Sequence, residues 1–527
     1  MVHEATPGVN PRVGAPLRGI DSGGPTGLQK RVEQEESRKM TSNKKEGGDP
    51  RIAIMGAGPG GLCMGIKLRE AGFENFVILE RSPQVGGTWN FNRYPGCACD
   101  IPSHLYSFSF EIKPDWKRPY ATQPEILEYL EGVADKYGML PFCRFDDGVA
   151  SAAWSDERAK WILRLDSGEK VEADIVVSAI GMFNSIVIPE IEGLETFEGT
   201  LFHSSRWDQE HSLEGERVGV IGAAGSAIQL IPEVAKMAGQ VHVFQRSANW
   251  VLPKEDTPYT EEELEHFRKD PNAAQEVRDG IFEGIESGQA FYDGAVREDM
   301  EATVREAIEV VENPEVREKL VPTHMWGCKR PLFSNDYYVA YNRPNLELVT
   351  EGIERITADS VVTDDGQERK IDTLVLATGF SSIEFLTAID VIGRNGLDLE
   401  DAWKDGAQAY MGMTTAGFPN LFMLYGPNTN QGSLITMIEW QVDHIIKHLE
   451  RMVDENLAWI DVKGDLQAEY NVQMQKDIEA VEPWMDGCTG YYRAASGRVV
   501  TQWPKNMTAF KQMIAEFNPE AYETGSI

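Results

Sequence analysis

Residues 52–61 read IAIMGAGPGG, and residues 218–227 read VGVIGAAGSA. Each stretch is an apolar run followed by a glycine-rich turn and then by a helical pattern. In such a turn the first glycine allows a tight bend, the second lets the backbone approach a pyrophosphate, and the third allows close helix–strand packing. The pyrophosphate then meets free N–H groups at the helix N-terminus. The two stretches predict an α/β fold with two Rossmann-like dinucleotide-binding domains.

The charge after the next apolar run differs between the two turns. Glu80 closes the run 76–79, whereas Arg246 closes the run 241–245. A carboxylate can accept hydrogen bonds from a free ribose 2′-hydroxyl and repels a 2′-phosphate, and a guanidinium does the reverse. The first turn is therefore suited to FAD and the second to NADPH, which predicts hydride transfer from nicotinamide to flavin. The predicted FAD contacts are Gly56, Gly58, Gly61 and Glu80; the predicted NADPH contacts are Gly222, Ala224, Gly225, Ser226, Ala227, Arg246 and Ser247.

The second turn departs from the ideal pattern at one position. Ala224 stands where the first turn has its middle glycine, so a methyl group points to where the pyrophosphate should approach. Weaker NADPH binding, or a unit that binds no nucleotide, is the alternative at this turn. A basic residue such as Arg246 has little structural reason to stand at its position, which favours the binding interpretation.

Composition limits the partners and the compartment. The chain has 527 residues, a net charge of −34 and 42% apolar residues. Such an acidic protein is not expected to bind nucleic acid. No apolar run approaches the ~20 residues of a membrane-spanning helix, so membrane insertion is not expected either. The six scattered cysteines suggest free thiols in a reducing cytoplasm. We expect a monomer or homodimer.

Repeated patterns divide the chain. Residues 1–48 are rich in polar residues, glycine and proline, which predicts a disordered N-terminal tail. Residues 150–180 have the pattern of a β-meander followed by a strand that ends in glycine, and residues 361–379 repeat it. We expect the FAD-binding domain to comprise 49–190 and 371–527, with an NADPH-binding domain at 191–370 nested within it. A helical insertion at 255–327 is expected to shape the substrate side, with helices at 261–268, 274–286 and 296–311.

The segment between the two turns carries a family fingerprint. It has the pattern F-x-G-x-x-x-H-x-x-x-W-D, formed by Phe197, Gly199, His203, Trp207 and Asp208. This segment resembles the fingerprint of the flavin-dependent type I Baeyer–Villiger monooxygenases. At the junction of two domains, His203 is expected to couple their motion rather than to act as an acid or base.

The resemblance extends over residues 50–515 and implies further site residues. Arg330 is implied as the catalytic cation beside the flavin, and Asp100 as its carboxylate partner. Met437 is assigned to the flavin site or the substrate pocket, with core packing as the alternative. The other implied FAD contacts are Gly87, Thr88, Trp89, Asp100, Tyr106 and Val149, and the other implied NADP contacts are Lys329, Arg330 and Trp503.

This family oxidises a ketone to an ester or lactone with NADPH and O2, by way of a C4a-peroxyflavin. A fixed cation stabilises such a peroxide and the adduct that it forms with the ketone, and arginine keeps its proton at any working pH. Asp100 could hold Arg330 by a bidentate pair. Sulfoxidation is expected as a side activity. The alternatives are a flavin N- or S-monooxygenase, an NADPH-dependent flavin reductase or oxidase, and a non-catalytic nucleotide sensor.

Two further patterns have simpler interpretations. Cys97 and Cys99 are spaced too closely for an unstrained disulfide, and Cys99 is expected to be a small buried residue. His444 and His448 share one face of a helix expected at 434–451, and no third ligand is evident. We therefore predict no metal site.

Overall fold

A computed structural model describes residues 49–526 apart from residues 271, 289, 290, 486, 489 and 491. The predicted tail at 1–48 lies outside the described residues. Where the structure describes the chain, none of its helices combines the length and the apolar character of a membrane-spanning segment.

Five parallel strands form the sheet that carries the first glycine turn. Its central strands are buried along their whole length, as expected for a sheet covered on both faces. The order across the sheet is β19 (Leu421–Met423), β7 (Ile175–Ser178), β1 (Ile52–Met55), β2 (Phe76–Leu79) and β3 (Cys143–Arg144).

A second sheet of five parallel strands carries the second glycine turn. Its outer strand β8 precedes the glycine turn in the chain, whereas the matching strand β19 of the first sheet is the last to be added. The chain thus forms β8 when it enters the second sheet and β19 when it returns to the first. The order is β13 (Leu346–Val349), β10 (Gln240–Phe244), β9 (Arg217–Ile221), β17 (Thr373–Leu376) and β8 (Thr200–His203).

One predicted boundary needs correction. Strand β17 pairs with β8 and β9 in the second sheet, although the predicted boundary at residue 370 assigns it to the FAD-binding domain. Its position matches that of β7 in the first sheet, as the repeated pattern at 361–379 implies. We place the return to the FAD-binding domain after residue 376, and the division into domains remains a proposal.

Both predicted meanders are confirmed. The first consists of β4 (Val149–Ser155), β5 (Lys160–Leu165) and β6 (Lys170–Ala173), and the second of β14 (Ile353–Ile356), β15 (Ser360–Thr363) and β16 (Glu368–Lys370). Strand β18 (Asp390–Ile392) joins β4 in parallel. Two short pairs complete the strands: β11 (Val251–Leu252) with β12 (Leu332–Phe333), and β20 (Trp459–Val462) with β21 (Tyr522–Gly525).

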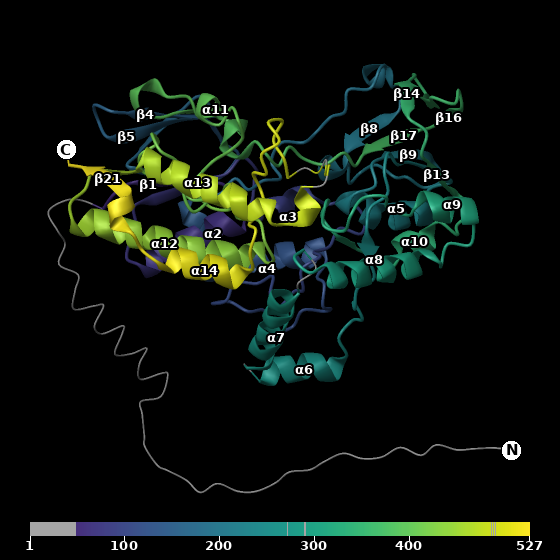
Figure 1. Cartoon of the computed structure of the whole chain (residues 1–527), viewed down its shortest axis with the longest axis horizontal. Helices are drawn as coiled ribbons and strands as arrows, with labels where there is room; N and C mark the ends of the chain where they lie inside the picture. Colours follow the sequence, from purple (N-terminus) through teal and green to yellow (C-terminus); the bar gives the residue numbers. More distant parts are fainter. Residues whose placement is uncertain are drawn as a thin grey trace, which may run out of the picture. The chain divides into compact units, whose positions relative to one another are not determined.

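Helices follow both glycine turns and pack on the sheets. Helix α2 (Pro59–Glu70) packs against α12 (Leu434–Asp454), and α12 against α14 (Met507–Ala515); α5 (Gly225–Met237) packs against α10 (Tyr337–Ala340). The three predicted helices of the insertion are confirmed as α6 (Glu261–Lys269), α7 (Ala273–Ser287) and α8 (Gly294–Ile308), and α9 (Pro314–Lys319) follows them. Figure 1 shows α6 and α7 extending away from both sheets. The remaining helices are α3 (Thr88–Phe91), α4 (Gln123–Lys136), α11 (Leu399–Ala402) and α13 (Gly464–Glu479).

The expectation of six free thiols is wrong for one pair. Cys328 and Cys488 form a disulfide across 160 residues of sequence, a contact that only the tertiary fold creates. Cys97 and Cys99 are free and buried, so the prediction that Cys99 is a small buried residue is confirmed. The cysteine pattern therefore no longer supports a reducing compartment.

Candidate active site between two nucleotide-binding units

The two glycine turns have the same backbone geometry. Gly56 and Gly222 have φ values of +102° and +120°, and a Cβ atom would come within 2.7 Å of the Ala179 carbonyl oxygen in the first and 2.3 Å of the Ala377 carbonyl oxygen in the second. A Cβ atom on Gly61 would lie 1.9 Å from the Gly56 carbonyl oxygen. Only glycine fits these positions, so the close helix–strand packing expected of the first turn is present.

Both turns leave a helix N-terminus open for a pyrophosphate. The N-cap residues Gly58 of α2 and Ala224 of α5 form no side-chain capping bond within the described structure. Ala224 has φ −101° and ψ −159°, close to the −75° and −171° of Gly58, so alanine does not distort the second turn. The residues at both helix ends fit the phosphates of a dinucleotide.

Glu80 is fixed beside the first turn by backbone hydrogen bonds. Its side chain accepts hydrogen bonds from the N–H groups of Ala57 at 2.7 Å and Ser82 at 2.8 Å, and the residue is 5% exposed. A carboxylate offers about four lone-pair positions, so two bonds leave room for ribose hydroxyls. The arrangement fits the predicted role of Glu80 with FAD.

The other predicted flavin residues lie near this turn or in the adjoining core. Gly87 precedes α3, and a Cβ atom there would lie 2.9 Å from the Cα of Gly58. Trp89 of α3, which begins at Thr88, donates its indole N–H to the Tyr106 hydroxyl at 3.1 Å, and burial raises the pKa of Tyr106. Val149 begins β4, and Met437 on α12 is fully buried in the main core. For Met437 this favours the core-packing alternative.

Two cations on the NADPH side lie close enough to influence each other. Lys329 donates to the Ser247 hydroxyl at 2.6 Å, and its pKa is lowered by burial and then by the nearby charge of Arg246. Arg246 is exposed at the end of β10. Since an anion between the two cations would relieve their repulsion, the group fits a 2′-phosphate.

Arg330 and Asp100 form an ion pair between the two units. Their side chains are 40% and 19% exposed, so the pair is open to a substrate from solution. Arg330 follows Lys329 in the chain, and Asp100 follows the segment that packs on α5. The ion pair therefore joins the segment of Lys329 to the segment that Gln229 of α5 holds.

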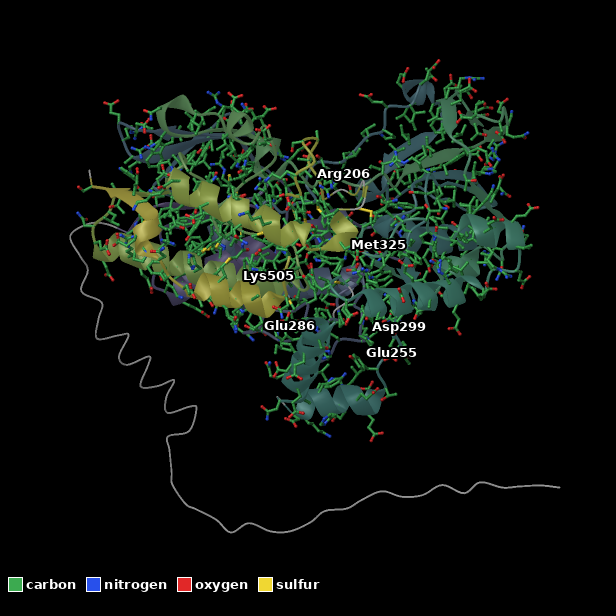
Figure 2. All side chains as sticks on the ribbon, in the orientation of Figure 1. Arg206, Glu255, Glu286, Asp299, Met325 and Lys505 are labelled. Carbon is green, nitrogen blue, oxygen red and sulfur yellow. A yellow bond between two sulfur atoms is a disulfide. The ribbon has the colours of Figure 1, made fainter. Side chains whose placement is uncertain are left out.

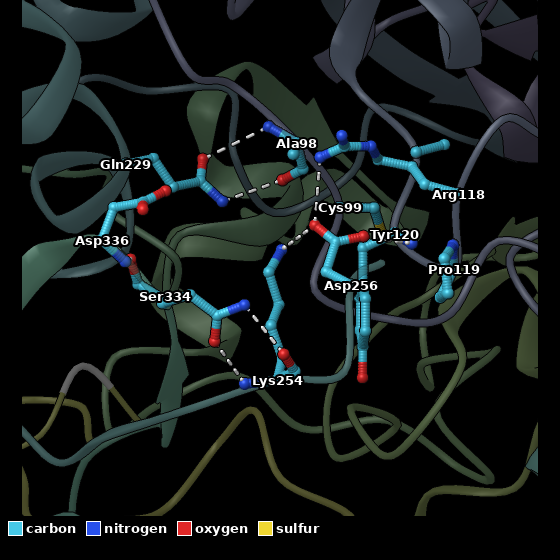
Figure 3. A network of polar contacts seen from close by, with 12 residues as sticks. Ala98, Cys99, Arg118, Pro119, Tyr120, Gln229, Lys254, Asp256, Ser334 and Asp336 are labelled. Carbon is cyan, nitrogen blue, oxygen red and sulfur yellow. Dashed lines mark hydrogen bonds and ion pairs between the residues drawn. The ribbon is translucent and has the colours of Figure 1, made fainter. Parts of the chain in front are cut away.

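Gln229 on α5 holds the segment before Asp100. Its side chain donates to the Ala98 carbonyl at 3.0 Å and accepts from the Ala98 N–H at 3.4 Å (Figure 3). It also accepts from the Tyr94 hydroxyl at 2.9 Å. A polar residue in a largely apolar helix was the only signal of this role in the sequence, and our predictions did not include it.

Asp256 forms a second contact between segments, also drawn in Figure 3. Its carboxylate accepts from Arg118 at 3.3 Å and from the Tyr120 N–H at 3.2 Å, and Lys254 lies 3.5 Å away. The Asp256 side chain is only 9% exposed. It ties the start of the insertion to the segment before α4.

The insertion is also anchored to the first unit by α7. Arg278 is 5% exposed and donates to the carbonyls of His104, Leu105 and Ser107, and Glu439 of α12 lies 3.9 Å away. Glu286, near the other end of α7 and labelled in Figure 2, accepts two backbone hydrogen bonds from the N-terminus of α14. A buried cation such as Arg278 needs hydrogen-bonding partners of this kind. The sequence did not reveal either anchor, because Arg278 and Glu286 are two of five charged residues spread along the 15 residues of α7.

His203 of the fingerprint is the last residue of strand β8 in the second sheet, next to the segment that follows β17. Its Nδ1 accepts from the Ser205 N–H at 3.2 Å, so its Nε2 carries the proton and donates to the Gly379 carbonyl at 3.1 Å. Burial lowers the pKa of His203, which keeps the ring neutral. Trp207 packs edge-on against Phe202 at 4.7 Å. A neutral histidine that joins two connecting segments fits the proposed coupling role.

The other fingerprint residues are structural in this arrangement. A Cβ atom on Gly199 would lie 2.3 Å from the Asp372 carbonyl oxygen and 2.5 Å from the ring of Phe197. Asp208 accepts a hydrogen bond from the Glu210 N–H at 2.9 Å. These contacts shape the connecting segment rather than a ligand site.

Two predicted features are buried within the described structure. Trp503 is 3% exposed, donates to the Asn506 carbonyl at 2.9 Å and packs edge-on against Phe510 at 5.3 Å. Its closing over NADP remains a prediction. His444 bonds through Nδ1 to the Ile514 carbonyl at 2.7 Å, and its Nε2 lies 3.3 Å from that of His448, so both rings pack inside the core.

Comparison with known proteins identifies the family. The family model for pyridine nucleotide-disulphide oxidoreductases matches residues 53–280. A Baeyer–Villiger monooxygenase of Pseudomonas aeruginosa is 38% identical over 478 residues, which cover 90% of this chain and 91% of that protein. A second, from Streptomyces coelicolor, is 38% identical over 476 residues, covering 88% and 90%. The chain belongs to the Baeyer–Villiger monooxygenase family.

Solved structures agree with this assignment. A steroid monooxygenase bound to NADP has a TM-score of 0.82 and 30% identity, covering 91% of this chain and all of that chain. A cyclohexanone monooxygenase from Rhodococcus sp. Phi1 bound to NADP+ has a TM-score of 0.82 and 32% identity, covering 91% and 99%. The predicted Baeyer–Villiger fold with two nucleotide-binding units is thereby confirmed, as is the prediction of an NADPH-dependent flavin monooxygenase.

Proposed function

We propose that this Baeyer–Villiger monooxygenase inserts one oxygen atom of O2 beside a ketone carbonyl, and that Arg330 and Asp100 carry the oxygenation step. Ketone, O2, NADPH and one proton give an ester or lactone, NADP+ and water. The observation that carries the proposal is the Arg330–Asp100 ion pair, which joins the two units beside Lys329 and Ser247.

The residues present fit both cofactors. Gly56, Gly58, Gly61 and Glu80 would hold FAD, and Arg246, Ser247 and Lys329 would hold the 2′-phosphate of NADPH. When bound, FAD accepts hydride from NADPH and reacts with O2. Arg330 supplies a permanent positive charge, which stabilises the negative charge that develops on the carbonyl oxygen of the ketone. Asp100 orients the guanidinium through a charge-assisted hydrogen bond.

The test is a product assay by mass spectrometry. Cyclic, linear, aromatic and steroidal ketones are incubated with the FAD-loaded protein, NADPH and air; the panel includes cyclohexanone and a steroid because of the names of the structural neighbours. We expect esters or lactones from the wild type and their loss in Arg330→Ala, while flavin reduction by NADPH persists. Arg355→Ala is the matched control, because Arg355 is 43% exposed and lies on the second meander.

Three outcomes would contradict the proposal. Sulfoxides or N-oxides without esters would favour an N- or S-monooxygenase. NADPH consumption that gives only hydrogen peroxide would favour an oxidase. Unchanged ester formation in Arg330→Ala would remove Arg330 from the reaction.

A further inference from the structure

A disulfide joins the segment that carries Lys329 and Arg330 to the C-terminal part of the chain. Cys328 and Cys488 are separated by 160 residues, and their Cα atoms lie 5.4 Å apart. They are 5% and 8% exposed. The bridge therefore stands directly before the two cations of the proposed site and is shielded from solvent.

The C-terminal side of the bridge is hydrogen-bonded to the first unit. The Tyr492 carbonyl accepts from the Val500 N–H at 2.9 Å, and the Val500 carbonyl accepts from the Asn428 N–H at 2.8 Å. Asn428 lies in the loop that follows strand β19 of the first sheet. The bridge thus connects the segment of Arg330 to a part of the chain that is held on the flavin side.

The segment around the bridge is packed from the insertion side as well. Gly327 has a φ of +87°, and a Cβ atom there would lie 2.9 Å from the ring of Phe291. That ring packs against Trp484 at 6.0 Å, and the adjacent Glu482 forms an ion pair with Arg297 of α8. The backbone before Cys328 is therefore enclosed by the same C-terminal segment that carries Cys488.

The ion pair with Asp100 orients the Arg330 guanidinium but does not fix the backbone that carries it. The Arg330 side chain is 40% exposed, so the position of its charge also depends on the backbone from which it extends. Catalysis by a fixed charge requires the charge to be in place before the reaction, and small displacements lower the rate strongly. The covalent bond at Cys328, two residues before Arg330, restrains that backbone.

We propose that the Cys328–Cys488 disulfide is a positioning element for the oxygenation reaction. It fixes the backbone from which Lys329 reaches Ser247 and Arg330 reaches Asp100. The part that concerns Arg330 rests on the proposed function; the part that concerns the backbone does not. When a small dithiol donates two electrons, the S–S bond breaks, each sulfur takes a proton, and the dithiol leaves as its own disulfide. Only non-covalent contacts then hold the segment of Lys329 and Arg330 to the C-terminal part of the chain.

The redox state is measured first. Alkylation of the denatured protein followed by mass spectrometry should find four free thiols in the untreated holoenzyme, namely those of Cys63, Cys97, Cys99 and Cys143. After treatment with the dithiol, all six cysteines should be labelled. Six labelled cysteines in the untreated protein would overturn the proposal.

The positioning role is then tested with Cys488→Ser, which leaves the sequence around Arg330 intact. We expect faster hydrogen exchange at residues 326–333, a dissociation constant for NADP+ raised about tenfold, and about fivefold more hydrogen peroxide per ester formed. Flavin reduction at saturating NADPH should change less than about twofold. The dithiol should produce the same changes in the wild type and no further change in Cys488→Ser.

Cys143→Ser is the matched control, because Cys143 is a free cysteine on edge strand β3 and its loss should leave every readout unchanged. If Cys488→Ser fails to fold, dithiol treatment of the wild type carries the test. The proposal is overturned if the protein without the disulfide has the same hydrogen exchange and the same NADP+ affinity as the untreated wild type. Failure of the wild type to form any ester would refute the proposed function alone, since hydrogen exchange and NADP+ binding still report on the bridge.

Discussion

Replacing Arg246 by alanine should weaken NADPH binding and leave NADH binding nearly unchanged. A hydrogen bond to a charged group contributes about 1.5–3 kcal/mol. Arg246 is exposed, so the lower value applies, and about 1.5 kcal/mol corresponds to about a tenfold rise in the dissociation constant. The loss is partly offset, because removing Arg246 relieves the repulsion that lowers the pKa of Lys329.

Lys329→Ala should have the larger effect. Lys329 is less exposed than Arg246 and is already held by Ser247 at 2.6 Å, so its bond to a phosphate falls at the upper value of about 3 kcal/mol, or about 100-fold. The assay is calorimetric titration of the flavin-loaded protein with NADPH and with NADH, with Arg355→Ala as the control. Equal losses for both nucleotides, or no loss for either, would refute the assignment of this site to a 2′-phosphate.

Three further predictions follow from the same geometry. Because burial and Arg246 lower the pKa of Lys329, the affinity for NADPH should fall as pH rises through that lowered pKa. The Lys329→Arg variant should keep its affinity for NADPH at high pH. Titration with NADPH and with NADH at each pH checks this. Gly61→Ala should give insoluble or flavin-free protein, as measured by the yield of bound FAD. Gly280→Ala in α7 is the control, because a Cβ atom there meets nothing within 4 Å. That variant should be neutral or stabilising by about 0.5–1 kcal/mol. Arg278→Met should destabilise the fold by about 3 kcal/mol or more. Burial raises the pKa of Glu439 and Arg278 opposes that shift, so Arg278→Met should raise the pKa further. The deficit should therefore grow as pH rises through the raised pKa that Glu439 has in the folded wild type. Thermal unfolding of Arg278→Met and of Arg278→Met/Glu439→Gln across pH is the measurement, and a deficit independent of pH would contradict the pairing.

The sequence predicted those parts of the site that depend on local geometry. Gly56, Gly61 and Gly222 occupy backbone positions that only glycine can take, so the pattern of each turn specifies its structure. The fingerprint around His203 includes strand β8, and its contacts with Asp372 and Gly379 lie at the two ends of the neighbouring strand β17. The coupling role of His203 stays a prediction. The repeat at 361–379 also indicated that strand β17 belongs to the second sheet, because it matches the strand β7 that follows the first meander. The predicted boundary at residue 370 did not take this repeat into account.

Contacts between distant segments were beyond the reach of pattern alone. The sequence gives no sign that Cys328 meets Cys488, because nothing but the folded arrangement brings them together. Arg278 is one arginine among many charged residues of α7, and its burial follows from packing against the segment at 104–107. Gln229 and Asp256 likewise gain their roles only when the two units meet.

The central claim is that Arg330 directs oxygen from O2 into a ketone while hydride passes from NADPH to flavin. Isotopically labelled O2 tests it most directly, with the ketone that gives most product. We predict one labelled oxygen in the ester or lactone, bonded between the carbonyl carbon and the migrated carbon, and its loss in Arg330→Ala with the label diverted to hydrogen peroxide. An ester without label, or a fully labelled product from Arg330→Ala, would contradict the account.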